Sequence, residues 1–209
     1  MHQPLTLKIT EMFPSIQGEG LRQGEPTLFI RLSGCNLKCS FCDTKYAWKK
    51  GQEYSTTQVL DKIKKMKLRF PASWVCLTGG EPMLQDVAPL TRELKSIGFK
   101  VQIETNATLF RPLHVDWFTI SPKPEKYYYA PEYRHMAKEV KIIVTRDLKL
   151  EIIRKLRMEF PLKIPFLLQP QSNRKWSLTL AMKLLRNALK NDLQNIRLSI
   201  QLHKILGLK

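Results

Sequence analysis

Residues 27–42 read TLFIRLSGCNLKCSFC, and they decide both the fold and the chemistry of the chain. Thr27 to Leu32 is a short apolar run, which predicts a strand. Cys35, Cys39 and Cys42 follow it directly, in the spacing CxxxCxxC. Clustered loop cysteines in an intracellular chain bind metal or perform chemistry more often than they form disulfides. We therefore expect a strand that leads into a metal-binding loop.

Short apolar runs alternate with helical patterns along the rest of the chain. Strands linked by helices pair in parallel through right-handed crossovers, and a complete eight-stranded barrel usually takes ~250 residues. With 209 residues, we expect one α/β domain over residues 1–209, built as a partial TIM-type barrel of parallel strands. The expected strands cover residues 27–32, 74–78, 101–105, 117–120, 139–144, 165–169 and 196–201, and the expected helices cover residues 55–70, 87–97, 150–160 and 178–189.

The composition is ordinary except for its charge. Hydrophobic residues make up 43% of the chain, which excludes a disordered or fibrous protein. No apolar run approaches the ~20 residues that cross a bilayer, and Met1 to Leu5 have no signal-peptide pattern, so we expect a cytoplasmic protein without a membrane partner. Lys and Arg number 35 against 18 Asp and Glu, a net charge of +17. This charge could bind a polyanion, but solvated helix faces such as Lys62 to Lys67 are the favoured explanation.

Three cysteines suit a [4Fe–4S] cluster that keeps one iron open. Thiolates ligate such clusters, normally four per cluster, so three leave one iron for a small molecule. S-adenosylmethionine (SAM) can bind that iron through its amino and carboxylate groups, and the protein then positions a cofactor that performs radical chemistry. A zinc site that adds His203 lacks the usual second ligand pair. Cys76 lies within an apolar strand and is expected to be a small core residue.

Polar motifs follow the predicted strands at their carboxyl ends, where parallel α/β sheets bind ligands. The first is Thr78-Gly79-Gly80-Glu81-Pro82. Its glycines let the backbone approach a ligand, and its acid can accept hydrogen bonds from an ammonium group. The others are residues 104–106 (ETN), 121–123 (SPK) and 169–172 (QPQS). Each can be an ordinary polar cap, but their shared placement predicts a common site.

Together these motifs resemble the 7-carboxy-7-deazaguanine synthase family of radical SAM enzymes. CxxxCxxC and GGEP belong to the whole superfamily, whereas QGEG, the Cys-Asp-Thr step and the tail LxxQxHK favour this family. The resemblance runs through residues 13–20, 29–35, 42–44, 78–82, 104–106, 121–123, 169–170 and 197–204.

The resemblance implies a reaction. The family converts 6-carboxy-5,6,7,8-tetrahydropterin to 7-carboxy-7-deazaguanine with loss of ammonia, a step in queuosine and other deazapurine biosynthesis. A 5′-deoxyadenosyl radical removes hydrogen from the substrate, the ring contracts, and SAM is regenerated. The resemblance further implies the cofactors [4Fe–4S], SAM and Mg²⁺, a shortened barrel and a homodimer. It also implies an electron donor of the flavodoxin or ferredoxin type and no required nucleic acid.

The resemblance also implies a role for each matching residue. The cluster ligands are Cys35, Cys39 and Cys42, and Thr44 is the protein ligand of magnesium, a hard cation that prefers oxygen. No catalytic side chain is singled out, because the cluster and SAM carry the radical chemistry. Arg31 grips the substrate carboxylate with its planar fork. SAM is lined by Phe41, Cys42, Asp43, Gly80, Glu81, Ser121, Pro122, Lys123, Gln169, Pro170, Gln171 and Ser172, and the substrate is contacted by Ile16, Gln17, Gly18, Glu19, Arg31, Thr78 and the carboxylate of Lys209.

Several residues have alternative explanations. Arg31 can pair with a surface acid, Thr44 can cap a helix, and His203 can be a buried structural histidine. Many family members have Gly where Ala107 stands, and residues 122–136 show no family pattern.

Two other functions fit part of the sequence. A radical SAM activase of a glycyl-radical enzyme shares CxxxCxxC and GGEP but has no need of QGEG or Cys42-Asp43-Thr44. A basic RNA-binding protein with a structural metal would cluster aromatic residues on a basic face, for which Tyr127 to Tyr129 is the only support.

Overall fold

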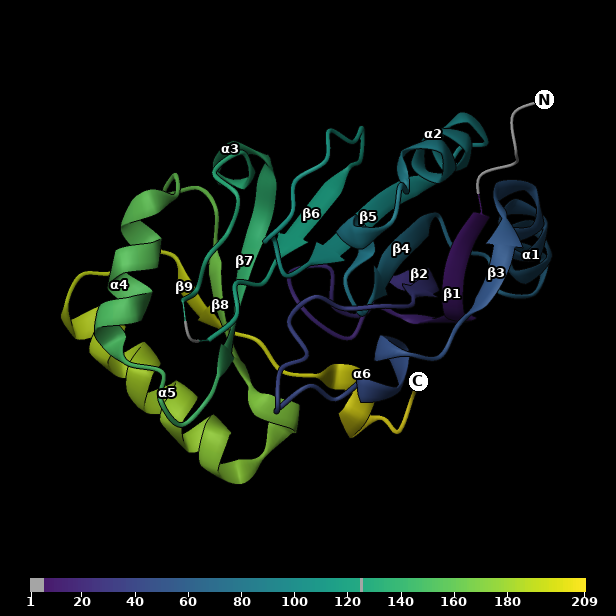
Figure 1. Ribbon diagram of the computed structural model, residues 1–209. Helices are drawn as coiled ribbons and strands as arrows, with labels where there is room; N and C mark the ends of the chain where they lie inside the picture. The colour runs from purple at the N-terminus through teal and green to yellow at the C-terminus, as the bar shows by residue number, and fades with distance from the viewer. Residues whose placement is uncertain (1–5, 125) are drawn as a thin grey trace. The chain divides into compact units, whose positions relative to one another are not determined.

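The computed structural model describes residues 6–124 and 126–209 (Figure 1). These residues divide into two compact units. The first unit holds residues 6–16, 25–105 and 109–117, and the second holds residues 17–24, 106–108, 118–124 and 126–209. Met1 to Leu5, which bear on the question of a signal peptide, and Glu125 lie outside the described residues. Within the described part of the chain, no helix has the length and apolar composition needed to cross a membrane.

A mixed sheet in the order β3-β1-β2-β4-β5 forms the first unit. β1 runs antiparallel to both β2 and β3, whereas β2, β4 and β5 are parallel. Parallel neighbours need crossover connections, which contain α1 and α2, two helices that pack against each other. The elements are β1 (Thr6–Ile16), β2 (Pro26–Leu32), η1 (Lys45–Trp48), β3 (Gln52–Ser55), α1 (Thr56–Arg69), β4 (Trp74–Gly79), η2 (Pro82–Leu84), α2 (Ala88–Ser96) and β5 (Lys100–Thr105), where η denotes a 3₁₀ turn.

Local sequence rules account for these elements. Ser55 and Gln58 form a capping box at the start of α1, in which each side chain accepts a hydrogen bond from the other residue's backbone N–H. Strand β2 is mostly buried and apolar, as is usual for a strand within a parallel sheet. Phe13 and Phe29 are cross-strand neighbours that stack with ring centroids 5.1 Å apart. Cys76 is buried with them, which confirms it as a core residue.

Parallel strands in the order β6-β7-β8-β9 form the second unit. Helices α4 and α5 lie in the crossovers of β7 to β8 and of β8 to β9, and they pack side by side (Figure 1). The elements are β6 (Trp117–Ile120), α3 (Tyr133–Met136), β7 (Ala137–Val144), α4 (Leu150–Glu159), β8 (Phe166–Pro170), η3 (Gln171–Asn173), α5 (Lys175–Lys190), β9 (Ile196–Leu198) and α6 (Leu202–Ile205).

The α/β class and each expected strand and helix are confirmed, with small shifts at their ends. Strand β9 ends at Leu198 rather than at residue 201. Strands β1 and β3, which form the antiparallel edge of the sheet in the first unit, are not among the expected strands. A register shift between Ile9 and Glu11 interrupts the alternation of buried and exposed residues by which a strand is recognised. The tyrosine run does not pack as one group, since the Tyr129 ring packs at a tilt against Phe160 while Tyr128 is 56% exposed.

Candidate active site

The three motif cysteines lie in the loop between β2 and η1 of the first unit. Cys35, Cys39 and Cys42 are outside any disulfide and partly exposed. The N–H of Cys42 donates to the carbonyl of Cys39 at 3.1 Å, and the N–H of Gly34 donates to the carbonyl of Ala47 at 2.9 Å. Backbone hydrogen bonds therefore hold both the turn between the last two cysteines and the base of the loop.

The glycine pair that ends β4 lies directly against the start of this loop. The N–H of Gly80 donates to the carbonyl of Leu32 at 3.0 Å, and the N–H of Glu81 donates to that of Gly34 at 2.7 Å. A Cβ on Gly80 would lie 1.8 Å from the carbonyl oxygen of Gly34 and 3.2 Å from the Cβ of Cys35. Only glycine permits this approach, so the GGEP motif supports the backbone that leads to Cys35.

These residues fit an iron–sulfur cluster. Cluster ligands are thiolates, and the three thiols are partly exposed and outside any disulfide. Among residues 6–124 and 126–209, no three His, Cys, Asp or Glu side chains converge as the ligands of a single metal ion. The ligands of a cluster bind separate iron atoms and stand farther apart than the ligands of one ion. Three spaced thiols on one supported loop are compatible with that arrangement.

The residues around the third cysteine stay beside it. Thr44 occupies the position before η1 but makes no capping hydrogen bond with its side chain, so the alternative of a side-chain cap is wrong. Its Oγ1 lies 3.5 Å from the Sγ of Cys42. Asp43 is exposed and Phe41 is half-buried.

A guanidinium is held in place on β2. The Nε of Arg31 donates to Oε1 of Glu11 at 2.8 Å, and the hydroxyl of Tyr46 donates to the same oxygen at 2.9 Å. Arg31 thus does pair with an acid, as the alternative explanation had it, and both side chains are partly buried, at 15% and 16% exposed. Burial opposes the charge of Arg31, but the hydrogen bond to Glu11 and the nearby negative groups outweigh it and raise the pKa of the guanidinium. Arg31 is thus a permanent cation with a fixed orientation.

Two further predicted residues lie on β4 and just after it. Thr78 is half-buried and is the partner of Arg31 in the parallel register of β2 and β4. Glu81 is fully buried, and its Oε1 accepts hydrogen bonds from the hydroxyl of Thr105 at 2.6 Å and from the N–H of Met83 at 3.0 Å. Its carboxylate is therefore bonded within the first unit.

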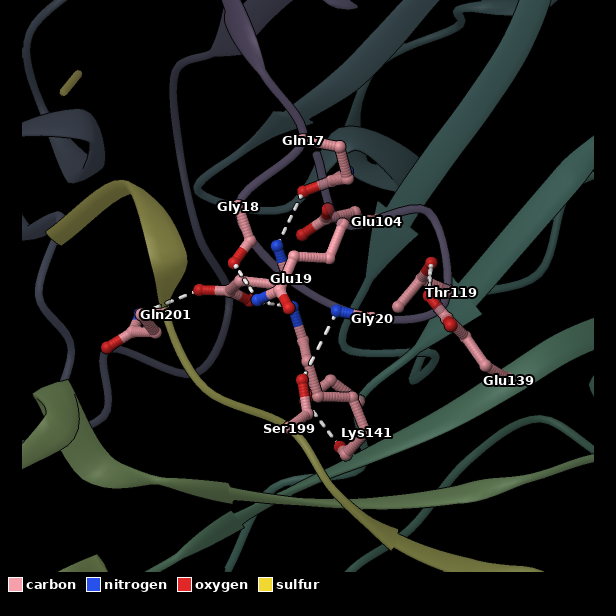
Figure 2. A network of polar contacts seen from close by, with 12 residues as sticks. Gln17, Gly18, Glu19, Gly20, Glu104, Thr119, Glu139, Lys141, Ser199 and Gln201 are labelled. Atoms are coloured by element: carbon pink, nitrogen blue, oxygen red, sulfur yellow. Dashed lines mark hydrogen bonds and ion pairs between the residues drawn. The ribbon is translucent and has the colours of Figure 1, made fainter. Parts of the chain in front are cut away.

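Gln17, Gly18 and Glu19 belong to the second unit, at the start of the chain segment between β1 and β2. Lys141 Nζ bonds to Oε2 of Glu19, and Gln201 Nε2 donates to its Oε1 at 2.6 Å (Figure 2). Burial by itself would raise the pKa of Glu19, but the charge and hydrogen bond of Lys141, with the amides of Gln201 and Gln169, lower it to about 2. The carboxylate is therefore ionised at neutral pH.

The other two strand-end motifs are also in the second unit. Ser121 donates through its Oγ to the carbonyl of Lys141 at 2.8 Å and accepts a hydrogen bond from the Nζ of Lys123 at 2.5 Å. Residues 169–172 run from the buried end of β8 into η3. Ser172 has a left-handed backbone with φ of 49°, which is uncommon for a residue other than glycine.

The C-terminal motif packs against the QGEG segment. The N–H of Leu202 donates to the carbonyl of Gly18 at 2.8 Å. A Cβ on Gly18 would lie 2.0 Å from Nδ1 of His203, so this partly buried ring rests directly on the loop backbone. Lys209 lies beyond α6 and is exposed.

Comparison with known proteins identifies the family. The sequence pattern of the radical SAM superfamily matches residues 29–125. The chain is 37% identical to the 7-carboxy-7-deazaguanine synthase of Aquifex aeolicus over 97% of this chain and 94% of that relative. It is 35% identical to the enzyme of the same name from Methanospirillum hungatei, over 99% and 90%. This chain belongs to the 7-carboxy-7-deazaguanine synthase family.

The 7-carboxy-7-deazaguanine synthase family also accounts for the fold. The crystal structure of QueE from Escherichia coli matches with a TM-score of 0.79 at 31% identity and covers 95% of each chain. This match confirms the radical SAM fold and the partial TIM-type barrel expected from the sequence. Membership of the radical SAM superfamily confirms the [4Fe–4S] cluster and SAM as cofactors.

Each unit brings part of the predicted synthase site together. In the first unit, the three cysteines and Thr44 lie on one loop, and Gly80 packs against the start of that loop. Arg31 lies next to Thr78 on the neighbouring strand. In the second unit, the QGEG segment meets the tail. The first unit contains Ile16, Arg31, Cys35, Cys39, Phe41, Cys42, Asp43, Thr44, Thr78, Gly80 and Glu81, and the second contains Gln17, Gly18, Glu19, Ser121, Pro122, Lys123, Gln169, Pro170, Gln171, Ser172 and Lys209.

Four residues around these synthase motifs are missed by sequence reasoning. Glu11 bonds Arg31, and Tyr46 bonds the same oxygen of Glu11. Because strand β1 was not predicted, its pairing with β2, which brings Glu11 to Arg31, could not be predicted either. Glu139 and Lys141 carry a usable signal. They are opposite charges two residues apart in an apolar strand, and a strand places such residues on the same face.

Proposed function

We propose that this protein is a 7-carboxy-7-deazaguanine synthase, a radical SAM carbon–nitrogen lyase. It converts 6-carboxy-5,6,7,8-tetrahydropterin to 7-carboxy-7-deazaguanine with loss of ammonia, in queuosine or other deazapurine biosynthesis. The observation that carries the proposal is the extent of the likeness, since 37% identity covers 97% of this chain and 94% of a curated synthase. The activase and RNA-binding alternatives account only for the superfamily motifs or for the positive charge.

The chain's own residues hold and orient the cofactors in this proposal. When bound, the cluster and SAM supply the 5′-deoxyadenosyl radical that removes a hydrogen atom from the pterin. Cys35, Cys39 and Cys42 ligate the cluster, and this role is supported by their position outside any disulfide and their partial exposure. The residues proposed to line SAM are Phe41, Cys42, Asp43, Gly80, Glu81, Ser121, Pro122, Lys123, Gln169, Pro170, Gln171 and Ser172.

Arg31 binds the carboxylate of the pterin in this proposal. Its fork can form two parallel hydrogen bonds with a carboxylate, and the bond to Glu11 fixes the plane of the fork before the substrate arrives. Such preorganisation strengthens binding because less side-chain freedom is lost. The other residues proposed to contact the substrate are Ile16, Gln17, Gly18, Thr78 and Lys209, with Glu19 close by.

Thr44 is the proposed protein ligand of Mg²⁺. Mg²⁺ takes oxygen ligands and keeps several waters, so one hydroxyl is a sufficient protein contribution. The side chain of Thr44 is not used to cap η1, which supports this role.

The remaining expectations are part of the same proposal. The two units act as one radical SAM domain, the protein is a cytoplasmic homodimer, and a flavodoxin or ferredoxin supplies electrons. No nucleic acid is required.

Anaerobic turnover tests the proposal. Reconstituted protein is incubated with SAM, reductant, Mg²⁺ and the carboxy-tetrahydropterin labelled with deuterium at C6. The deazaguanine and the deuterium content of SAM are measured by mass spectrometry. We expect product together with deuterium transfer from the substrate C6 into SAM. Loss of ammonia without the deazaguanine, or consumption of one SAM per product, would contradict the proposed reaction.

A further inference from the structure

The segment of residues 17–24 has no regular secondary structure, yet it is held at many points. The N–H of Gly24 donates to the carbonyl of Gln17 at 2.8 Å, which closes the segment into a loop. Gln23 Nε2 donates to the carbonyls of Gly18 at 3.1 Å and of Ile200 at 2.9 Å. We call residues 17–24 the QGEG loop. Its conformation is set by contacts with the rest of the second unit.

The first of these contacts is a buried ion pair. The Lys141 side chain is 7% exposed and that of Glu19 is 14% exposed. Lys141 and Gln201 each bond a different carboxylate oxygen of Glu19 (Figure 2). A buried carboxylate is stable only when it is paired and hydrogen-bonded, and here both oxygens already have partners within the second unit.

The second contact comes from the same strand. Glu139 and Lys141 are two residues apart on β7 and point to the same face. Oε2 of Glu139 accepts the N–H of Leu21 at 2.7 Å. Its Oε1 accepts the hydroxyl of Thr119 at 2.7 Å (Figure 2). A Cβ on Gly20 would lie 2.3 Å from Glu139 Oε1, and the φ of Gly20 is +74°. Only glycine allows the loop to pass this close to the carboxylate.

We infer that Lys141 is a positioning residue: through Glu19, it holds the QGEG loop in the conformation that presents Gln17 and Gly18 to the substrate. The inference rests on the proposed function, and it assigns Glu19 to anchoring the loop rather than to contacting the pterin. Glu139 acts with Lys141, so a single strand secures the loop by two charged side chains.

A loop without its anchor would populate the binding-competent conformation for only part of the time. The apparent dissociation constant rises by the inverse of that fraction, so a competent population of ~1–10% weakens binding ~10–100-fold. The rate of reaction within the enzyme–substrate complex changes less, because the QGEG loop already has the binding-competent conformation in that complex. The effect of losing Lys141 should therefore appear in the KM for the pterin more than in kcat.

The test compares Lys141→Met with Arg157→Met in the reconstituted holoenzyme. Arg157 is also a buried cation of the second unit, but its guanidinium donates to backbone carbonyls of Phe160, Pro161 and Ile164. Both variants lose a buried cation, and only one of these cations bonds the QGEG loop. The readouts are KM and kcat, the dissociation constant of SAM, iron content, Tm, and hydrogen exchange of the Gly20 and Leu21 amides without substrate.

We expect Lys141→Met to raise the KM for the pterin ~10–100-fold and kcat to change less than ~3-fold, with faster exchange of the Gly20 and Leu21 amides and unchanged SAM affinity. Arg157→Met should lower Tm without these effects. Adding Glu19→Gln to Lys141→Met should recover part of the lost affinity, because no uncompensated charge then remains buried.

Two results would overturn the inference. One is an unchanged KM with full amide protection in Lys141→Met, and the other is an equal rise in KM for Arg157→Met at a similar loss of Tm. If Lys141→Met does not fold, Glu19→Gln replaces it, since it preserves the side-chain shape and should still accelerate loop exchange. The exchange measurement needs no turnover, so a wild-type protein that makes no deazaguanine would disprove the proposed function while leaving the anchor testable.

Discussion

Replacing Arg31 by lysine tests how the substrate carboxylate is bound. Lysine keeps the positive charge but cannot supply the planar fork. In the wild-type protein the Nε of Arg31 is bonded to Glu11 at 2.8 Å, and the side chain is 15% exposed, so the guanidinium is oriented and largely desolvated. The variant therefore loses both the orienting bond and one of the two bonds that a fork makes with a carboxylate.

The size of the effect follows from the lost bond to the ligand. A hydrogen bond that involves a charged group contributes ~1.5–3 kcal/mol, which corresponds to roughly 10- to 150-fold in the dissociation constant. We expect Arg31→Lys to weaken pterin binding within this range. Glu11→Gln should cost less, about 3- to 10-fold, because the Gln carbonyl can still accept from Nε although the charge assistance is gone.

The assay is anaerobic equilibrium binding of the pterin to the SAM-loaded holoenzyme, with Tm and iron content as checks on folding. The matched control is the double variant Lys64→Gln and Lys65→Gln, which removes two exposed charges from α1. Lys62 and Lys67 are left unchanged because they lie over the rings of Tyr54 and Phe99. Pterin affinity within twofold of wild type for Arg31→Lys, or an equal loss for the control, would refute the assignment of Arg31.

Four further outcomes are expected. Cys35→Ala, Cys39→Ala and Cys42→Ala should each abolish turnover and lower iron content, whereas buried Cys76→Ala should keep both; zinc in place of iron after anaerobic purification would contradict the cluster. Thr44→Val should raise the Mg²⁺ concentration for half-maximal activity by about tenfold, equivalent to ~1.4 kcal/mol, with iron content unchanged; an unaltered Mg²⁺ response would remove Thr44 from the site. The pKa of Glu19 is lowered from 4.5 to about 2, so its contribution to stability is present above pH 4.5 and is lost as pH falls towards 2; Glu19→Gln should flatten the fall in Tm between pH 5 and 2, and parallel curves would disprove this linkage. Ala107 has a φ of 64°, which costs a residue with a Cβ roughly 1–2 kcal/mol, so Ala107→Gly should stabilise the protein by about 0.5–1 kcal/mol after the larger chain entropy of glycine is subtracted; a lower free energy of unfolding would show that the backbone there is not strained.

Much of the fold could be read from periodicity. The crossover helices and the parallel strands each carry a local pattern, which is either a 3.6-residue spacing of apolar residues or a short apolar run. These patterns were sufficient to locate the helices and strands in the sequence. Strand β1 carries only a broken pattern, because Thr10 to Met12 are all half-buried and interrupt the alternation of buried and exposed residues next to the register shift between Ile9 and Glu11. The antiparallel edge of the sheet in the first unit was therefore not predicted from the sequence.

The sequence by itself determined the chemistry of the site. Cys35, Cys39 and Cys42 are close along the chain, so their spacing alone predicts a shared cluster, and GGEP, QGEG and the tail motif identify the family without any coordinates. Such motifs can be recognised in a sequence because ligands and turns require particular residue types at short, fixed intervals.

Only the tertiary structure decided which side chains hold the binding groups in place. Glu11 is 20 residues from Arg31 and Lys141 is 122 residues from Glu19. No local spacing records such pairs, because they are formed by the pairing of β1 with β2 and by the packing of the QGEG loop on β7. Charged partners of this kind are specified by strand register and burial, and these arise only when distant segments of the chain fold together.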